Sequence, residues 1–136
     1  MALLNLKYNE ETMYEQLGEL LLPDEQITAA VYASFQNKGF MAGPAVQAGF
    51  FAMTDQDRLI GVRHAMLDSA AFGGYIGLLH SLKVKKSLFG AYVMDYDDGS
   101  VKLRITMTPK LGTGVHLPHQ AENIQTMVAA LETRQI

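Results

Sequence analysis

The hydrophobic pattern predicts a helix close to the N-terminus of the chain. Asn9 can serve as an N-cap, and the two acidic residues that follow it favour the positive end of a helix dipole. Apolar residues then recur at helical spacing from Met13 to Leu21, and Pro23 forbids continuation. We therefore expect a helix over roughly residues 9–21, which packs either on its own domain or on a neighbouring copy.

A second helix is predicted at the C-terminal end. It begins near Pro118, since proline suits a first helical turn. Its apolar residues fall at positions i, i+3, i+4 and i+7 and form one stripe, which has to be buried against the rest of the molecule. These residues are Ile124, Met127, Val128 and Leu131.

Between these helices the hydrophobic period changes to two, which is typical of half-buried strands. The pattern is clearest over residues 27–35, and an Asp98-Gly99 pair marks a hairpin. Residues 65–74 are ambiguous, because helix-forming residues are followed there by a Phe-Gly-Gly break. Further strands are predicted at 46–54, 59–64, 88–94 and 101–107, with a shorter alternating segment around Leu82 and Val84.

The predicted order is helix, six or seven antiparallel strands, helix. Such a strand set has to hide its edges and its apolar face. We expect a mainly β fold with flanking helices (α+β), a curled antiparallel sheet or partly open barrel that the C-terminal amphipathic helix closes. Residues 1–22 then form an N-terminal helical extension, and residues 23–136 form the domain itself.

Composition narrows the functional classes. The chain has 136 residues, 49% of them hydrophobic, which fits one globular domain. It has no cysteine, which excludes disulfides and thiolate catalysis. A formal net charge of −3 argues against a nucleic-acid partner. The sequence contains neither a signal peptide pattern nor a spanning apolar stretch, so we expect a cytoplasmic protein.

Three stretches resemble a known family. Residues 22–27 (Leu-Pro-Asp-Glu-Gln-Ile) are similar to the entry into the first strand of the bacterial pleckstrin-homology-like (PH-like) domains, the YokE-like or GRAM-related kind. Residues 49–60 look like the central hairpin of that family, and the Asp-Gly hairpin and closing helix complete the pattern. The resemblance covers about residues 20–134 and leaves out the leading helix.

The resemblance implies a non-catalytic module without a cofactor, which binds phosphoinositides, peptides or further copies of itself. Members that bind phosphoinositides carry basic residues in and beside the loop after the first strand. Here residues 36–45 offer only Lys38, which argues against a phosphoinositide ligand. In the hairpin motif we expect a structural turn, in which Thr54, Asp55 and Asp57 bond to turn amides and Arg58 reaches the turn acids.

Two groups of residues are candidate binding surfaces. Lys83, Lys85 and Lys86 form the densest positive cluster, which either meets an anionic partner or membrane surface or guards an edge strand against pairing. Phe40 and Met41 lie in a loop rich in glycine and proline, where an exposed apolar tip would suit a partner or a second copy.

The sequence contains two sets of residues that could form a catalytic or metal site. His64 and His80 with Asp68 could form an acid–base pair, but no nucleophile motif accompanies them. His116 and His119 fall short of the three or four ligands that zinc needs, so we expect no metal. The leading hypothesis is a self-associating PH-like interaction module with a protein partner. The alternatives are a barrel that binds a small hydrophobic ligand or lipid, and an enzyme that uses His64, His80 and Asp68.

Overall fold

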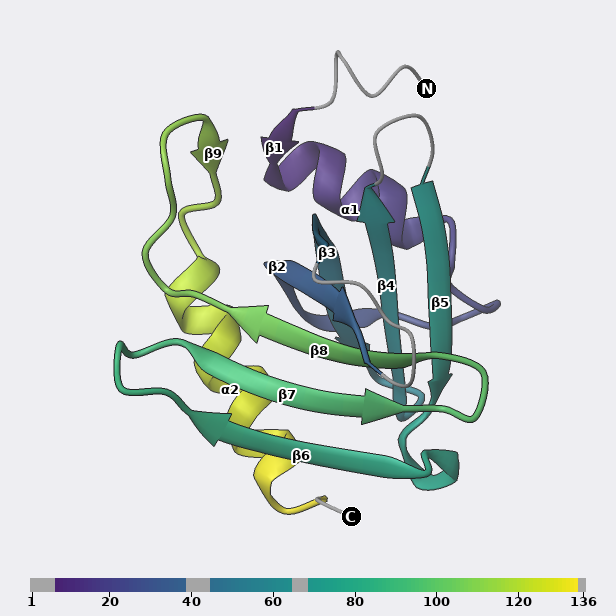
Figure 1. Cartoon of the computed structure of the whole chain (residues 1–136). Coiled ribbons are helices and arrows are strands. Elements are labelled where there is room, and N and C mark those ends of the chain that lie inside the picture. Colours follow the sequence, from purple (N-terminus) through teal and green to yellow (C-terminus); the bar gives the residue numbers. More distant parts are fainter. Residues whose placement is uncertain (1–6, 39–44, 65–68, 135–136) are drawn as a thin grey trace.

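The computed structural model describes residues 7–38, 45–64 and 69–134 (Figure 1). Within these ranges, two helices and nine strands follow one another, with a short 3₁₀ turn (η2) before β6. Their bounds are β1 Tyr8–Asn9, α1 Glu10–Gly18, β2 Ile27–Asn37, β3 Val46–Thr54, β4 Arg58–His64, β5 Ser69–Tyr75, η2 Ile76–Leu78, β6 Ser81–Lys86, β7 Tyr92–Asp97, β8 Lys102–Met107, β9 Val115–His116 and α2 Gln120–Glu132.

Seven strands form one antiparallel sheet in the order β5-β4-β3-β2-β8-β7-β6. The long strand β2 joins the two halves. It pairs with β3 along most of its length but with β8 only from Ser34 to Asn37. Because the two halves share only this end of β2, they diverge, and the sheet curls into a half-barrel with an inner and an outer face (Figure 1).

Helix α2 closes the inner face. Its four predicted apolar residues are all buried there, together with rings and aliphatic side chains from both halves of the sheet. Gln120 fixes the start of the helix: its side chain accepts a hydrogen bond from the Tyr32 backbone N–H and donates to the Tyr32 carbonyl, both at 2.9 Å. The predicted closing helix is thus confirmed.

Helix α1 covers the outer face of the first half of the sheet. Its buried residues Met13 and Leu17 pack against Phe50 and Ile60 in a second apolar cluster. Strand β3 is therefore covered on both faces, which explains why it is an almost continuous apolar run rather than an alternating one. In this structure the leading helix packs on its own sheet, which the sequence left open.

The predicted fold class is confirmed: a mainly β α+β fold whose curled antiparallel sheet carries a helix at each end of the chain. A seven-stranded sheet closed by a C-terminal helix corresponds to the PH-like architecture. Within the described ranges, no helix combines the length and the apolar character required to cross a bilayer.

Several element predictions need correction. Residues 88–94 do not form one strand, because residues 87–91 make a turn and β7 begins only at Tyr92. Asp95 and Asp97 belong to β7, and the hairpin turns at Asp98-Gly99 as predicted. The ambiguous segment contains strand β5, and α1 ends at Gly18, three residues before the predicted end.

Candidate functional site

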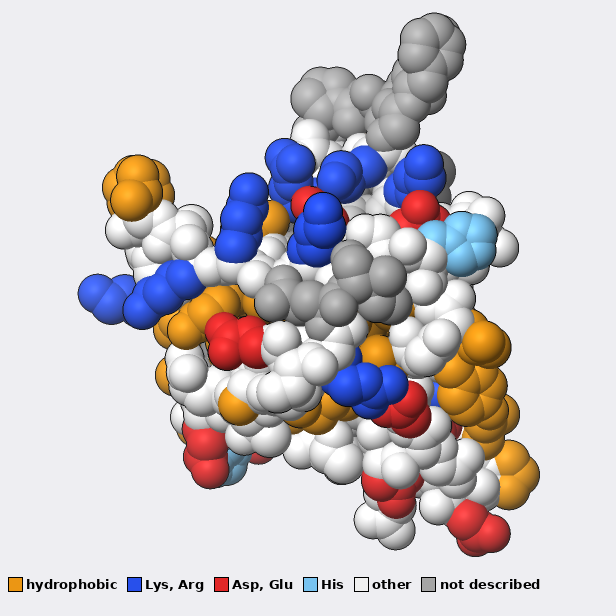
Figure 2. Space-filling view, turned by 90° about the horizontal axis from the view of Figure 1, so that it is seen from below, with side chains coloured by type: hydrophobic (Ala, Val, Ile, Leu, Met, Phe, Trp, Pro, Cys, Tyr) orange, Lys and Arg blue, Asp and Glu red, His pale blue; other side chains and the backbone are white. Residues whose placement is uncertain are grey.

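The predicted lysine cluster lies on β6, one edge of the seven-stranded sheet. Leu82 and Val84 point into the core, so Lys83 and Lys85 share the exposed outer face. Lys86 has the opposite orientation, and its Nζ lies 5.9 Å from the centroid of the Tyr92 ring. Figure 2 shows Lys and Arg side chains gathered along its upper side, the side on which the outer face of β6, β7 and β8 lies.

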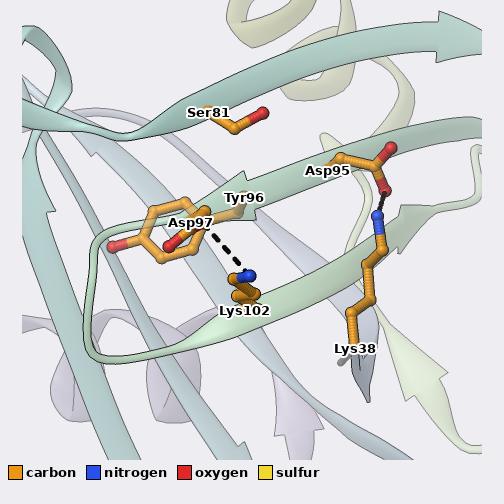
Figure 3. A pocket seen from close by; sticks show the side chains of 6 residues that line it. All are labelled: Lys38, Ser81, Asp95, Tyr96, Asp97 and Lys102. Carbon is orange, nitrogen blue, oxygen red and sulfur yellow. Dashed lines mark ion pairs between the residues drawn. The ribbon is translucent and has the colours of Figure 1, made fainter. Parts of the chain in front are cut away.

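The same outer face holds a depression of about 270 Å³. Its charges are paired with one another (Figure 3). Lys38 Nζ lies 3.0 Å from Asp95 Oδ1, and Lys102 Nζ lies 4.0 Å from Asp97 Oδ2. Arg104 Nε adds a contact with Asp95 Oδ1 at 3.7 Å. Since each aspartate already has a cation beside it, the depression is a neutralised polar surface and lacks the concentrated charge of an anion or cation site.

The hairpin motif forms a structural turn, in which the Thr54 hydroxyl accepts the Gln56 N–H at 3.3 Å as expected. The partners of Arg58 and of the two turn acids differ from the expected ones. Arg58 does not pair with the turn acids, because its Nη1 lies 2.6 Å from Oε1 of the buried Glu25. Glu25 Oε2 accepts a hydrogen bond from the Thr54 hydroxyl at 2.6 Å, and its Oε1 accepts one from the Leu22 N–H at 2.8 Å. The four residues fasten the segment before β2 to the β3–β4 hairpin.

Burial of Glu25 raises the pKa of its carboxyl, but the bonds from Thr54, Leu22 and Arg58 outweigh this, and the net pKa is lowered. The carboxylate is therefore charged and fully engaged at neutral pH. It is a structural group, since each of its contacts is made within the fold. Sequence reasoning missed Glu25 because it counted the residue only as part of a family motif.

The turn acids have separate roles. Asp55 Oδ1 accepts the Gln26 N–H at 2.9 Å, an amide of a neighbouring segment instead of its own turn. Asp57 adopts a positive φ of 61° and holds Arg134 through two bonds of 2.5 and 2.8 Å. The hydrogen bonds from Arg134 lower the pKa of the Asp57 carboxyl. This contact ties the C-terminal end of α2 to the β3–β4 turn.

The candidate catalytic histidines lie on different parts of the sheet. His64 ends β4, where it contacts Tyr8, Gln16 and the Phe50 ring, and burial lowers its pKa. His80 precedes β6, and its ring lies against Gly99. The end of β4 and the start of β6 are at opposite ends of Figure 1. Asp68, the predicted partner, lies outside the described residues.

His116 and His119, the two histidines before α2, also belong to no group of metal ligands among the described residues. In residues 7–38, 45–64 and 69–134, no group of three or more metal-ligating side chains comes together. His119 Nδ1 instead lies 2.6 Å from Glu10 Oε1 and joins the starts of the two helices. The hydrogen bond to Glu10 raises the pKa of His119.

The two candidate apolar residues of the loop after β2, Phe40 and Met41, lie outside the described residues. The structure exposes a different apolar pair, Leu88 and Phe89, in the turn between β6 and β7. Sequence reasoning missed this pair because it continues into an apolar strand. The flanking Ser87 and Gly90 were the signal that a turn precedes that strand.

The other edge of the sheet is β5, and it differs from β6 in composition. It carries no charged residue, and Ala70, Ala71 and Gly73 are exposed. Within the described parts of the chain, β5 pairs with β4 alone. Tyr75, the last residue of β5, is 44% exposed, and Leu78, in the turn that follows, is 74% exposed.

The inner face is filled by side chains. Phe35, Phe51, Phe72 and Tyr96 form a chain of ring contacts with centroids 5.2–6.3 Å apart. The hydroxyl of Tyr96 donates to Asp98 at 2.9 Å, and burial together with this acid raises the pKa of Tyr96. The arrangement is that of a packed core, so it lends no support to a ligand cavity in this region.

Comparisons with protein-family models, with curated proteins and with solved structures found no match to this chain. The surfaces of the chain are therefore the guide to its function.

Proposed function

We propose that this protein is a non-catalytic, PH-like interaction module that self-associates through strand β5. In the dimer, β5 of one copy pairs with β5 of a second copy across a two-fold axis, and the two sheets become continuous. The observation that carries this proposal is the contrast between the two edges of the sheet: β6 is protected by lysines, whereas β5 is uncharged and lined by small residues.

The contrast matters because an edge strand presents unpaired backbone groups that can pair with another chain. In a two-fold pair, each residue meets its own kind near the axis. Lysines of two β6 strands would then oppose each other, which is destabilising. The alanines and glycines of β5 allow close approach without such repulsion, and the neighbouring Tyr75 and Leu78 supply apolar surface for the contact.

Sedimentation-velocity centrifugation over a wide range of protein concentration tests the proposal. We expect the native chain to shift from monomer to dimer as concentration rises. Ala71→Lys places a charge on each copy close to the two-fold axis and should weaken dimerisation about tenfold or more. Ala129→Lys, at an exposed position of α2, makes the same change away from the edge and should behave like the native chain.

Two results would contradict self-association through β5. One is a native chain that remains monomeric at the highest concentration reached. The other is a dimer that Ala71→Lys leaves unchanged, provided that circular dichroism shows both lysine variants to be folded.

A further inference from the structure

The tip of the β6–β7 hairpin exposes two large apolar side chains side by side. Leu88 is 99% and Phe89 is 96% exposed. The turn that carries them is closed by hydrogen bonds: the Ser87 N–H donates to the Ala91 carbonyl at 2.7 Å, and the Gly90 N–H donates to the Ser87 carbonyl at 3.2 Å. Gly90, at a φ of +85°, allows the backbone to complete this turn. The two apolar side chains are thus held out into solvent by a defined turn.

The hairpin segment that carries the tip contains positive charge alone. Residues 81–94 contain three lysines, Lys83, Lys85 and Lys86, and no acidic residue. The first acid that follows is Asp95, which Lys38 and Arg104 already contact. The whole chain has a net charge of −3, so the hairpin is a local positive region on a negative molecule.

We infer that this hairpin tip docks onto an anionic lipid bilayer. Leu88 and Phe89 enter the boundary between headgroups and acyl chains, and the lysines contact the phosphate-bearing headgroups. A protruding apolar tip beside lysines has the chemistry of interfacial membrane binding, in which apolar groups enter about 5–10 Å and anionic lipids attract the cations. This inference does not depend on the self-association proposed above.

A protein partner fits the same features less well. Lysine is depleted in protein–protein interfaces, and their central contacts are apolar side chains seated in pockets. Here three lysines lie on the hairpin whose tip projects from only two strands. A bilayer needs no complementary pocket, and its negative surface matches the lysines. The negative remainder of the chain is repelled by that surface, which orients the hairpin toward it.

The two proposed surfaces are compatible in space. The β6–β7 turn lies at the left of Figure 1, and β5 lies at the right. Figure 2 likewise shows an isolated hydrophobic group at its upper left, away from the hydrophobic group on its right side. A molecule paired through β5 therefore keeps its hairpin tip free.

Co-sedimentation of the full chain with vesicles tests the inference. We expect binding to vesicles that contain phosphatidylglycerol and little binding to vesicles of phosphatidylcholine alone. Leu88→Ser with Phe89→Ser should abolish the binding and leave the fold intact, because both side chains are solvent-exposed. Lys85→Ala with Lys86→Ala should weaken it about 25-fold, at about fivefold for each lysine. Val46→Ser, at a 61% exposed valine outside both proposed surfaces, is the matched control and should bind normally.

A fluorescence probe gives a second readout. The chain contains no tryptophan, so Phe89→Trp provides a single reporter at the tip. Its emission should shift to the blue when phosphatidylglycerol vesicles are added, whereas the emission of Val46→Trp, at a position outside both proposed surfaces, should stay unchanged. Failure of the native chain to bind these vesicles, or unchanged binding of the double serine variant, would overturn the inference.

Self-association distinguishes the two proposals. The double serine variant should dimerise like the native chain, and Ala71→Lys should still bind anionic vesicles. If the serine substitutions instead abolish dimerisation, the tip is a contact between copies, and the assignment to a membrane is wrong.

Discussion

Replacing Arg58 by alanine is expected to destabilise the fold by about 3–5 kcal/mol, because it leaves a buried carboxylate without its cation. The Glu25 side chain is fully buried, and its Oε1 lies 2.6 Å from Arg58 Nη1. The remaining donors, Thr54 and the Leu22 N–H, satisfy hydrogen bonds but do not neutralise the charge. A loss of this size is a large part of the 5–15 kcal/mol that stabilises a typical domain. Urea unfolding followed by circular dichroism measures it.

A double variant separates the effect of the buried charge from the effect of the packing around it. Glu25→Leu with Arg58→Met removes both charges, so we expect the double variant to lose less stability than Arg58→Ala alone. Lys102→Ala is the control, since Lys102 lies 4.0 Å from Asp97 and is largely exposed. It should cost less than about 1 kcal/mol. If Arg58→Ala and Lys102→Ala have equal effects, the buried network does not stabilise the fold as described.

The same network makes the stability of the fold depend on pH in the acidic range. The pKa of Glu25 is lower in the folded chain than its unfolded value of about 4.3. The charged carboxylate therefore contributes fully above the unfolded value, and its contribution is lost as pH falls through the folded pKa. We expect Glu25→Gln to lose less stability than the native chain between about pH 5 and pH 3. Equal losses in urea titrations across that range would contradict this expectation.

Val128→Asp is expected to unfold the domain, because it places an unpaired charge where α2 closes the half-barrel. Val128 is 3% exposed and belongs to the cluster that holds both halves of the sheet together. Without a docked α2, the apolar inner face would be open to water. A thermal melt should show the cooperative transition lost or shifted far below that of the native chain.

The neighbouring position supplies the control. Ala129 is exposed on the same helix, so Ala129→Asp introduces the same carboxylate in water and should change stability by no more than about 0.5 kcal/mol. If Val128→Asp melts within a degree or two of Ala129→Asp, α2 does not cover the sheet.

The outlines of the fold were predictable from local patterns. The stripe from Ile124 to Leu131 predicted which face of α2 is buried, since helical spacing alone decides which side chains share a face. The alternation in residues 27–35 predicted β2, and Asp98-Gly99 predicted the turn between β7 and β8. Errors occurred where an apolar run continued across a boundary, as at Leu88, where hydrophobicity does not distinguish a strand from the turn before it.

The site residues were less predictable. The lysines predicted an edge strand as one of two interpretations, and the complete strand order confirms that β6 is an edge. Glu25 and Arg58 are 33 residues apart, and no local pattern indicates that the two meet. The open edge at β5 depends likewise on which strand lies beside it.

The sequence by itself determined the order of elements, the buried stripe of α2 and the positions of charge along the chain, because spacing and residue type act locally. The tertiary structure alone decided the partners: that Arg58 holds Glu25, that β5 is the second edge, and that α1 covers the outer face of β3. Contacts of this kind join residues far apart in the chain. They become definite only when the strands are ordered and the sheet has curled.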